Sequence, residues 1–188
     1  MKAFVISGSR NPQGRTARAA EALLEGLRGQ GAEAEIVFLP QMDVQRCRQC
    51  DEAGWGLCRQ EGRCVIEDDF AGLVKKIRAA DAAVFANPVY FGDLSESLRA
   101  FLDRLRRTTR HEAGRQGLAG KCAVGVCVAG GGGGGAPACT VSLEKVLATC
   151  GFDVVDMIPV RRQNLGMKLQ VLSTVGGWLA KGAPLLPA

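Results

Sequence analysis

The chain alternates short, mainly apolar runs with longer segments of helical periodicity from its beginning almost to its end. The apolar runs predict five strands. They are Ala3–Ser7, Glu33–Leu39, Ala82–Ala86, Cys122–Val128 and Phe152–Val160. Apolar strands that are separated by helices are typical of a parallel sheet covered on both faces. The pattern therefore predicts an α/β fold with one doubly wound, five-stranded parallel sheet.

The segments between these runs carry apolar side chains at the three- and four-residue spacing of an amphipathic helix. The predicted helices are Thr16–Arg28, a segment from Asp68 or Asp69 through Ile77, a segment from Ser95 through Leu105, Pro137–Cys150, and a weaker one around 165–172. A length of 188 residues suits a single domain, so we expect one domain over 1–188 with a cysteine-rich loop at about 41–66.

Composition and charge exclude several classes of protein. Hydrophobic residues make up 47% and charged residues 23%, which excludes a disordered chain. The net charge of +5 suits anionic ligands. We interpret the densest basic stretch (Arg104, Arg106, Arg107 and Arg110) as cations at a helix C-terminus rather than a nucleic-acid surface. The chain shows neither a membrane span nor a signal peptide, so we expect a cytoplasmic protein without nucleic-acid or membrane partners.

Ligands of such sheets bind at the carboxyl ends of the strands, which directs attention to the following loops. After the first predicted strand comes Ser7-Gly8-Ser9-Arg10-Asn11-Pro12-Gln13-Gly14-Arg15-Thr16. Hydroxyl groups, glycines and two arginines there lead into a helix N-terminus, which favours a phosphate. Five residues separate Gly8 from Gly14 and no lysine follows, so this is not the phosphate loop of nucleotide hydrolases. An ordinary strand-to-helix turn is the alternative.

Two further loops have compositions suited to a flat ring. Asn87-Pro88-Val89-Tyr90-Phe91-Gly92 follows the third predicted strand, and its aromatic pair can cover a planar heterocycle unless Phe91 packs inward. Six successive glycines at 130–135 follow the fourth strand and let the backbone approach a ring closely; a flexible linker is the alternative. Together the three loops predict a site for a phosphate attached to a flat ring.

The distribution of the cysteines is a second feature that indicates function. Of eight cysteines, Cys47, Cys50, Cys58 and Cys64 lie in one loop. Clustering in a chain without a secretion signal indicates metal or redox chemistry more than structural disulfides. Core packing is the expectation for Cys122, Cys127, Cys139 and Cys150.

The three loops in combination resemble the flavodoxin-like NAD(P)H-dependent FMN reductases over roughly residues 1–160. They are most similar to the iron–sulfur flavoprotein branch, whose cysteine loop falls between the second strand and the following helix. The resemblance implies FMN, NAD(P)H as co-substrate, the strand order 2-1-3-4-5, and a homodimer or homotetramer. A nicotinamide nucleotide or a small redox protein would be the electron donor.

Carried over residue by residue, the resemblance assigns the phosphate to Ser9, Arg10, Asn11, Gly14, Arg15 and Thr16. It places the flavin ring against Asn87, Pro88, Val89, Tyr90, Phe91 and Gly92, with Gly130, Gly131, Gly132 and Gly133 at the other edge. No catalytic side chain is expected, because the flavin carries the chemistry.

The cysteine spacing departs from that branch. The branch has a compact C-x2-C-x2-C pattern with a fourth cysteine soon after, whereas here Asp51–Leu57 stretches the middle gap between Cys50 and Cys58. A few extra loop residues cost little entropy, so the four thiolates can still hold a 4Fe-4S cluster. Tetrahedral zinc or redox-active thiols are the alternatives. Charge on the thiolates would be offset by Arg46, Arg48, Arg59 and Arg63.

The sequence thus predicts an FMN-dependent NAD(P)H oxidoreductase that passes electrons through FMN to an acceptor. Two alternatives remain open: a non-enzymatic electron carrier of the flavodoxin type, and a thiol or metal redox sensor on a flavin fold. The apolar tail at 183–188 has no helix of its own to join, so we expect it to pack on a second copy of the chain.

Overall fold

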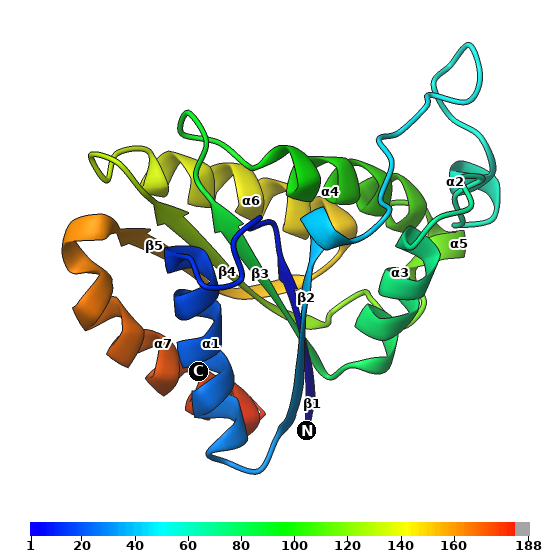
Figure 1. The fold of residues 1–188 in the computed structure, drawn as a ribbon. Helices are drawn as coiled ribbons and strands as arrows, with labels where there is room; N and C mark the ends of the chain where they lie inside the picture. The colour runs from blue at the N-terminus through cyan, green and yellow to red at the C-terminus, as the bar shows by residue number, and fades with distance from the viewer. Residues whose placement is uncertain (183–188) are drawn as a thin grey trace.

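The computed structural model describes residues 1–182. Five parallel strands form one sheet in the order β2-β1-β3-β4-β5 (Figure 1). The strands are β1 (Lys2–Ser7), β2 (Glu33–Phe38), β3 (Ala82–Pro88), β4 (Cys122–Ala129) and β5 (Asp153–Arg161). This is the flavodoxin-like fold that the sequence predicts.

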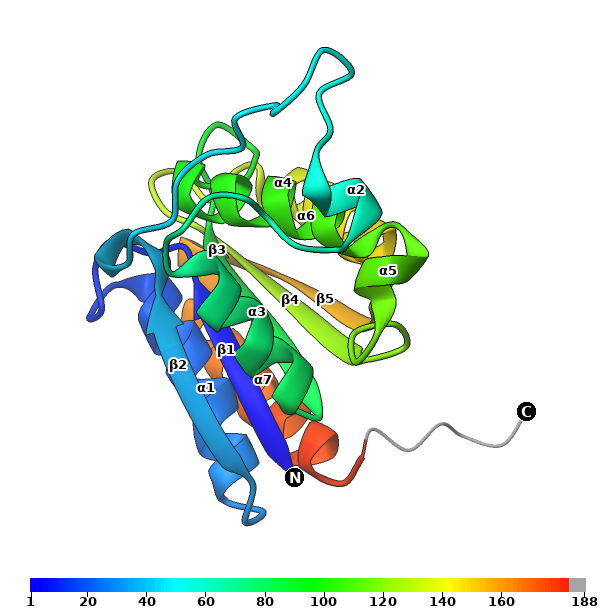
Figure 2. The same cartoon turned by 90° about the vertical axis from the view of Figure 1, so that its right-hand side faces the viewer.

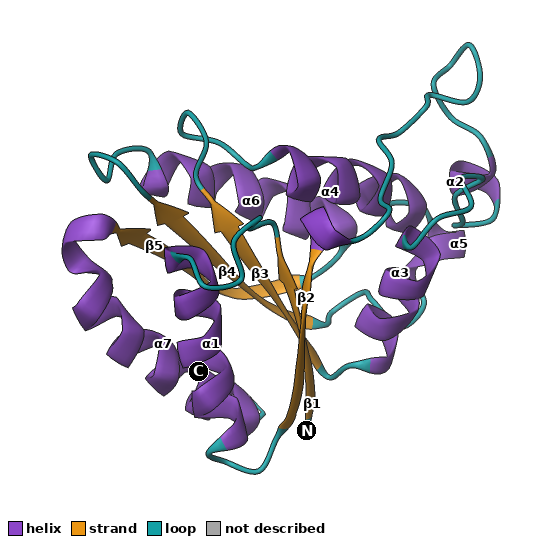
Figure 3. Ribbon diagram, in the orientation of Figure 1, coloured by secondary structure: helices purple, strands orange, loops and turns teal. Residues whose placement is uncertain are grey.

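All five predicted helices are present; the first four connect successive strands and the last one follows the final strand (Figure 3). They are α1 (Arg15–Arg28), α3 (Phe70–Ala79), α4 (Glu96–Thr109), α6 (Ala136–Cys150) and α7 (Leu165–Ala180). Four single-turn helices were not predicted: η1 (Leu39–Gln41), α2 (Leu57–Gln60), α5 (Glu112–Arg115) and η2 (Arg162–Asn164). Segments this short are below the length at which apolar periodicity can be recognised.

The helices cover both faces of the sheet, with α1 and α7 on one side and α3, α4 and α6 on the other (Figure 2). Each face of the sheet has its own hydrophobic core, and alternate residues of β1 belong to the two cores. Phe4 and Ile6 face α3 and α4, while Ala3 and Val5 face α1. Helices α1 and α7 approach closely, since a Cβ on Gly26 would lie 1.9 Å from the Ser173 carbonyl oxygen.

The loops that follow β1, β3 and β4 lie at the same end of the sheet, and the cysteine loop (residues 42–69) leaves the fold from that end (Figure 1). Among residues 1–182, no helix combines the length and apolarity needed to cross a membrane. The predicted contact of the tail at 183–188 lies outside the described residues.

Candidate functional site

Hydrogen bonds among its own residues fix the loop after β1. The Ser9 Oγ donates to the Asn11 carbonyl at 3.1 Å and accepts from the Asn11 N–H at 3.3 Å. The Asn11 Oδ1 accepts from the Gln13 N–H at 2.9 Å. Gly14 occupies the N-cap of α1, where it has no side chain to cap the helix, and the first turn carries no acidic residue. The first N–H groups of α1 therefore have no side-chain cap, which is the arrangement that binds anions.

Two arginines and a threonine accompany this helix terminus. Arg10 and Arg15 are exposed, whereas Thr16 is buried in the first turn. The Arg15 Nη1 would lie 3.7 Å from a Cβ on Gly130. The loop after β1 and the glycine run after β4 are therefore neighbours.

Asn87 differs from the expectation. Its side chain is fully buried, and its Oδ1 accepts from the Ser95 N–H at 3.0 Å and from the Ser95 Oγ at 3.1 Å. Its Nδ2 donates to the Pro88 carbonyl at 2.8 Å and to the Cys139 Sγ at 3.2 Å. The hydrogen-bond partners of the Asn87 amide all belong to the protein. Asn87 therefore holds the loop in place instead of facing a ligand.

Gly8 allows the loop after β1 to lie against the start of α4. A Cβ on Gly8 would come within 2.4 Å of the Ser95 Oγ, and the Ser97 Oγ donates to the Gly8 carbonyl at 3.2 Å. Ser95 also caps α4 by accepting from the Leu98 N–H. From the sequence, Ser95 was predicted only as a helix start, because its contacts with Gly8 and Asn87 depend on the tertiary fold.

The two aromatic residues of the loop after β3 lie on different sides of it. Tyr90 and Asp93 pair through two backbone hydrogen bonds, and both Phe91 (φ 51°) and Gly92 (φ 80°) at the turn have left-handed backbone conformations. Phe91 is fully exposed, so the inward-packing alternative is wrong. Phe91 lines a cleft with Val89 and residues 129–135, whereas Tyr90 lines a second hollow with Arg10, Met42 and Glu96. Of these two aromatic residues, Phe91 is therefore the one that lines the cleft of the glycine run.

The glycine run is a folded turn, not a linker. Gly133 N–H donates to the Gly130 carbonyl at 2.7 Å, and the Gln163 Nε2 donates to the Gly132 carbonyl at 2.8 Å. A Cβ on Gly135 would lie 2.7 Å from the Cα of Gly92, so this turn meets the loop after β3. Glycine at 135 is required both by that contact and by its φ of 79°.

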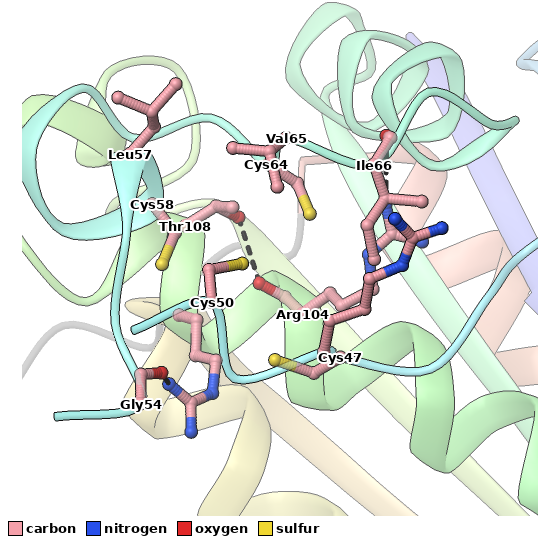
Figure 4. Close-up of a pocket in the computed structure, with 12 residues that line it drawn as sticks. Cys47, Cys50, Gly54, Leu57, Cys58, Cys64, Val65, Ile66, Arg104 and Thr108 are labelled. Atoms are coloured by element: carbon pink, nitrogen blue, oxygen red, sulfur yellow. Dashed lines mark hydrogen bonds between the residues drawn. The ribbon is translucent and has the colours of Figure 1, made fainter. Parts of the chain in front are cut away.

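The four loop cysteines line one pocket (Figure 4). Three helix residues, Arg104, Arg107 and Thr108 of α4, complete its wall together with Arg48 and apolar residues of the loop. None of the four forms a disulfide. Within residues 1–182, no three histidine, cysteine, aspartate or glutamate side chains are arranged to hold a metal ion. The structure thus brings the predicted cysteines together without placing them in a ligating geometry.

Arg104 is buried in the wall of this pocket, whereas Arg106 and Arg107 lie in the last turn of α4, where the interpretation of the basic stretch as helix C-terminal cations puts them. Its Nη1 donates to the Asp68 Oδ2 at 2.6 Å and its Nη2 to the Asp68 Oδ1 at 2.9 Å, with both side chains fully buried. Burial by itself would raise the pKa of Asp68, but hydrogen bonds from Arg104 and from the N–H groups of Gln45 and Phe70 lower it below its usual value. The sequence did not reveal the burial of Arg104, because its partner Asp68 is far from it along the chain.

Arg107, one turn later on α4, contacts the stretched middle gap. Its Nη1 donates to the Gly54 carbonyl, and its guanidinium lies 4.8 Å from the centre of the Trp55 ring. The other partner of Trp55 is His111, whose ring centre is 5.0 Å away. Charge beside the cysteines therefore comes largely from α4. Of the four loop arginines expected there, Arg48 lines the pocket.

The other four cysteines lie in the sheet and in α6, as predicted. Cys127, Cys139 and Cys150 are buried, and Cys122 is half-buried. Burial raises the pKa of the Cys150 thiol to about 12. Such a thiol is inert at neutral pH.

Comparison with known proteins places these features in a family. Residues 1–168 match the model of the NADPH-dependent FMN reductase family. An iron–sulfur flavoprotein of Methanocaldococcus jannaschii is 34% identical over 70% of this chain and 65% of its own length. An iron–sulfur flavoprotein of Methanosarcina thermophila is 36% identical over 55% of this chain and 52% of its own length. The matches thus span about half to two thirds of these relatives.

Solved structures share the fold. An NAD(P)H:quinone oxidoreductase from Methanothermobacter marburgensis superposes with a TM-score of 0.71 at 22% identity, covering 95% of this chain and 96% of that one. A flavodoxin from the domain Archaea superposes with a TM-score of 0.59 at 15% identity, covering 96% of this chain and 99% of that one. The match along residues 1–168, supported by this fold, shows that the chain belongs to the NADPH-dependent FMN reductase family.

Proposed function

We propose that this protein is an FMN-dependent NAD(P)H oxidoreductase that passes electrons from a reduced donor through FMN to an acceptor. The observation that carries the proposal is the convergence of three loops at the carboxyl ends of β1, β3 and β4. Arg15 approaches Gly130, which joins the first loop to the third, and a Cβ on Gly135 would touch Gly92, which joins the third to the second. This is the edge at which ligands of such sheets bind.

The residues of the first loop suit the FMN phosphate. The uncapped N-terminus of α1 supplies backbone N–H groups, and Arg10 and Arg15 supply positive charge. Ser9 and Thr16 add hydroxyl groups, while Asn11 and Gly14 shape the turn. Charge-assisted hydrogen bonds of this kind are the strong ones in phosphate recognition.

The second and third loops suit the flavin ring. Phe91, Val89 and Gly92 line the same cleft as Gly130 to Gly133, and glycine leaves room for a flat ring to approach the backbone. Asn87 fixes the loop after β3 by accepting two hydrogen bonds from Ser95. Bound FMN would supply the ability to accept electrons as a pair and release them singly, while the protein binds, orients and shields it.

We also propose that the cysteine pocket holds an iron–sulfur cluster. Four free thiols around one pocket are the donor set of such clusters. The Arg104 Nε is buried and has no hydrogen-bond partner within residues 1–182, so the wall of the pocket retains an unused donor. Arg104 and Arg107 provide positive charge beside the thiolates. The relatives named iron–sulfur flavoproteins support this assignment.

The donor and the assembly are proposed from the family. A nicotinamide nucleotide is the donor we favour, with a small redox protein as the alternative. We propose a homodimer or homotetramer, and light scattering should give a mass of at least twice the 19.9 kDa of one chain. A mass near 19.9 kDa at micromolar concentration would contradict it.

Two linked measurements test the oxidoreductase. FMN is first titrated into flavin-free protein, and the loaded protein is then supplied with NADH or NADPH and a quinone under anaerobic conditions. The proposal predicts saturable FMN binding and continuous, FMN-dependent oxidation of the nicotinamide. Tight FMN binding without turnover would instead favour the electron carrier, and absence of FMN binding would contradict both.

A further inference from the structure

Two arginines of α4 contact different parts of the cysteine loop. Arg104 and Arg107 are three residues apart and thus lie on the same side of the helix. Both line the pocket formed by the four cysteines. Arg104 is seen there in Figure 4. Arg104 contacts the two ends of the cysteine loop, and Arg107 contacts its middle.

Arg104 holds the two ends of the loop. Its Nη1 donates to the Gln45 carbonyl at 3.0 Å, two residues before Cys47. Its Nη2 donates to the Ile66 carbonyl at 3.4 Å, two residues after Cys64. The paired Asp68 accepts from the Gln45 N–H at 2.9 Å, which connects the two ends directly. The segments that carry the first and last cysteines are thus tied to one buried guanidinium.

Arg107 holds the middle of the loop. Gly54 and Trp55, its two contacts, belong to the segment 51–57 between Cys50 and Cys58. The Asp51 carboxylate closes this segment into a turn by accepting from the Trp55 N–H at 2.6 Å. Gly56 lies against Cys50, since a Cβ on Gly56 would be 3.1 Å from the Cys50 Cβ. The stretched gap is therefore a folded turn docked on α4.

We infer that Arg107, through Gly54 and Trp55, is a positioning residue that docks the 51–57 turn on α4 and so keeps Cys50 and Cys58 at the same pocket as Cys47 and Cys64. This inference rests on the proposed cluster for its functional meaning. It explains how a chain with a stretched gap between its second and third cysteines retains one four-cysteine pocket.

The chain offers matched variants for a test. Arg107→Met keeps the aliphatic stem and removes the guanidinium, and Trp55→Leu removes the ring from the other side of the contact. Arg106→Met is the control, because Arg106 lies on the same helix but pairs at the surface with Asp103. Trypsin supplies a metal-free readout, since Arg48 and Arg59 are exposed on either side of the turn.

Two quantities are measured on the full chain: the rate of tryptic cleavage after Arg48 or Arg59 in metal-free protein, and the rate of iron loss to a chelator after anaerobic reconstitution with iron and sulfide. For Arg107→Met and Trp55→Leu we expect both rates to rise about fivefold or more, because cleavage reports the population of the undocked loop. The double variant should add little to either single one. Arg106→Met should match the wild type, and FMN affinity should be unchanged in all variants.

The outcomes separate this inference from the proposed function. Equal cleavage rates in wild type, Arg107→Met and Trp55→Leu would overturn the docking role whether or not iron binds. Faster cleavage with unchanged iron retention would overturn the positioning of the cysteines. Failure of the wild type to take up iron, with cleavage still faster in the variants, would contradict the cluster and leave the docked turn established.

Discussion

The Arg104 guanidinium and the Asp68 carboxylate face each other with two hydrogen bonds, at 2.6 and 2.9 Å, and both side chains are fully buried. This pair joins α4 to the end of the cysteine loop, immediately before α3 begins. A buried ion pair costs desolvation when it forms, but losing one partner leaves an uncompensated buried charge. Replacing either residue should therefore weaken the attachment of the cysteine loop to α4.

Replacement of Asp68 by asparagine should lower the free energy of unfolding by about 3 kcal/mol or more, because it leaves the Arg104 charge buried without its partner. Asp103→Asn is the matched control: its pair with Arg106 is partly exposed, so the loss should be at most about 1 kcal/mol. Urea unfolding at pH 7 measures both. Equal losses in the two variants would contradict the burial argument.

The same pair predicts a pH dependence. The pKa of Asp68 lies below the ordinary value of an aspartate in the folded protein, so the unfolded chain takes up the proton first as the pH falls. The stabilisation from Asp68 is therefore complete above the unfolded pKa and is lost as the pH falls through the lowered, folded one. In Asp68→Asn, this part of the acid dependence should be missing. A parallel decline of stability in both proteins between pH 5 and the acid transition would contradict the assignment.

Gly8→Ala should destabilise the protein by about 1–3 kcal/mol, because the added Cβ would come within 2.4 Å of the Ser95 Oγ beneath the site. Gly72→Ala on α3 is the matched control, since nothing lies within 4 Å of its Cβ position. Alanine in a helix is favoured over glycine, so that variant should gain up to about 1 kcal/mol. Thermal unfolding measures the stability of the two variants. Unchanged stability of Gly8→Ala would show that the Ser95 side chain can move away from the added Cβ, and would contradict the prediction.

Phe91 combines full exposure with a left-handed backbone, at φ 51°. A residue with a Cβ pays about 1–2 kcal/mol there, so Phe91→Gly should leave the stability of flavin-free protein unchanged or raise it slightly. It should weaken FMN about tenfold if the ring stacks on the flavin. Phe91→Tyr keeps the ring and should bind FMN as the wild type does. Unchanged FMN affinity in Phe91→Gly, measured by calorimetry, would remove Phe91 from the flavin site.

Arg10→Ala and Thr16→Ala should each weaken FMN at least about tenfold, since charge-assisted hydrogen bonds to a phosphate are worth about 1.5–3 kcal/mol. Arg18→Ala serves as the control, because Arg18 is exposed on the same helix and lines a hollow next to α7. Fluorescence titration of flavin-free protein measures the affinities. Wild-type affinity in both Arg10→Ala and Thr16→Ala would contradict the phosphate assignment.

Local sequence patterns were sufficient for the five strands and the five longer helices. Each predicted strand agrees with the structure to within two residues, because continuous apolar runs such as Cys122–Val128 mark a strand buried on both faces. The order of the strands could not be read from periodicity and came from the resemblance alone. Short helices such as α2 and α5 were missed, since a single turn has no period.

The positions of the candidate loops could be predicted from their composition, whereas contacts between residues that are distant in the sequence could not. The loop after β1 and the glycine run have distinctive local sequences. The burial of Asn87 depends on Ser95 and Cys139, and that of Arg104 on Asp68, and no local pattern reveals these partners. The opposite orientation of Tyr90 and Phe91 follows from the tight turn between Tyr90 and Asp93, which the sequence signalled only through Gly92.

The claim that one chain carries both a flavin and a four-cysteine cluster is tested most directly by analysing FMN, iron, sulfide and zinc in anaerobically reconstituted protein, together with its absorption spectrum. We expect about one FMN and about four irons per chain, with matching sulfide. Iron should fall in Cys50→Ser and Cys64→Ser, which alter the pocket, and not in Cys139→Ser, which alters a buried residue of α6. Zinc in place of iron, or no metal under strict anaerobiosis, would contradict the cluster.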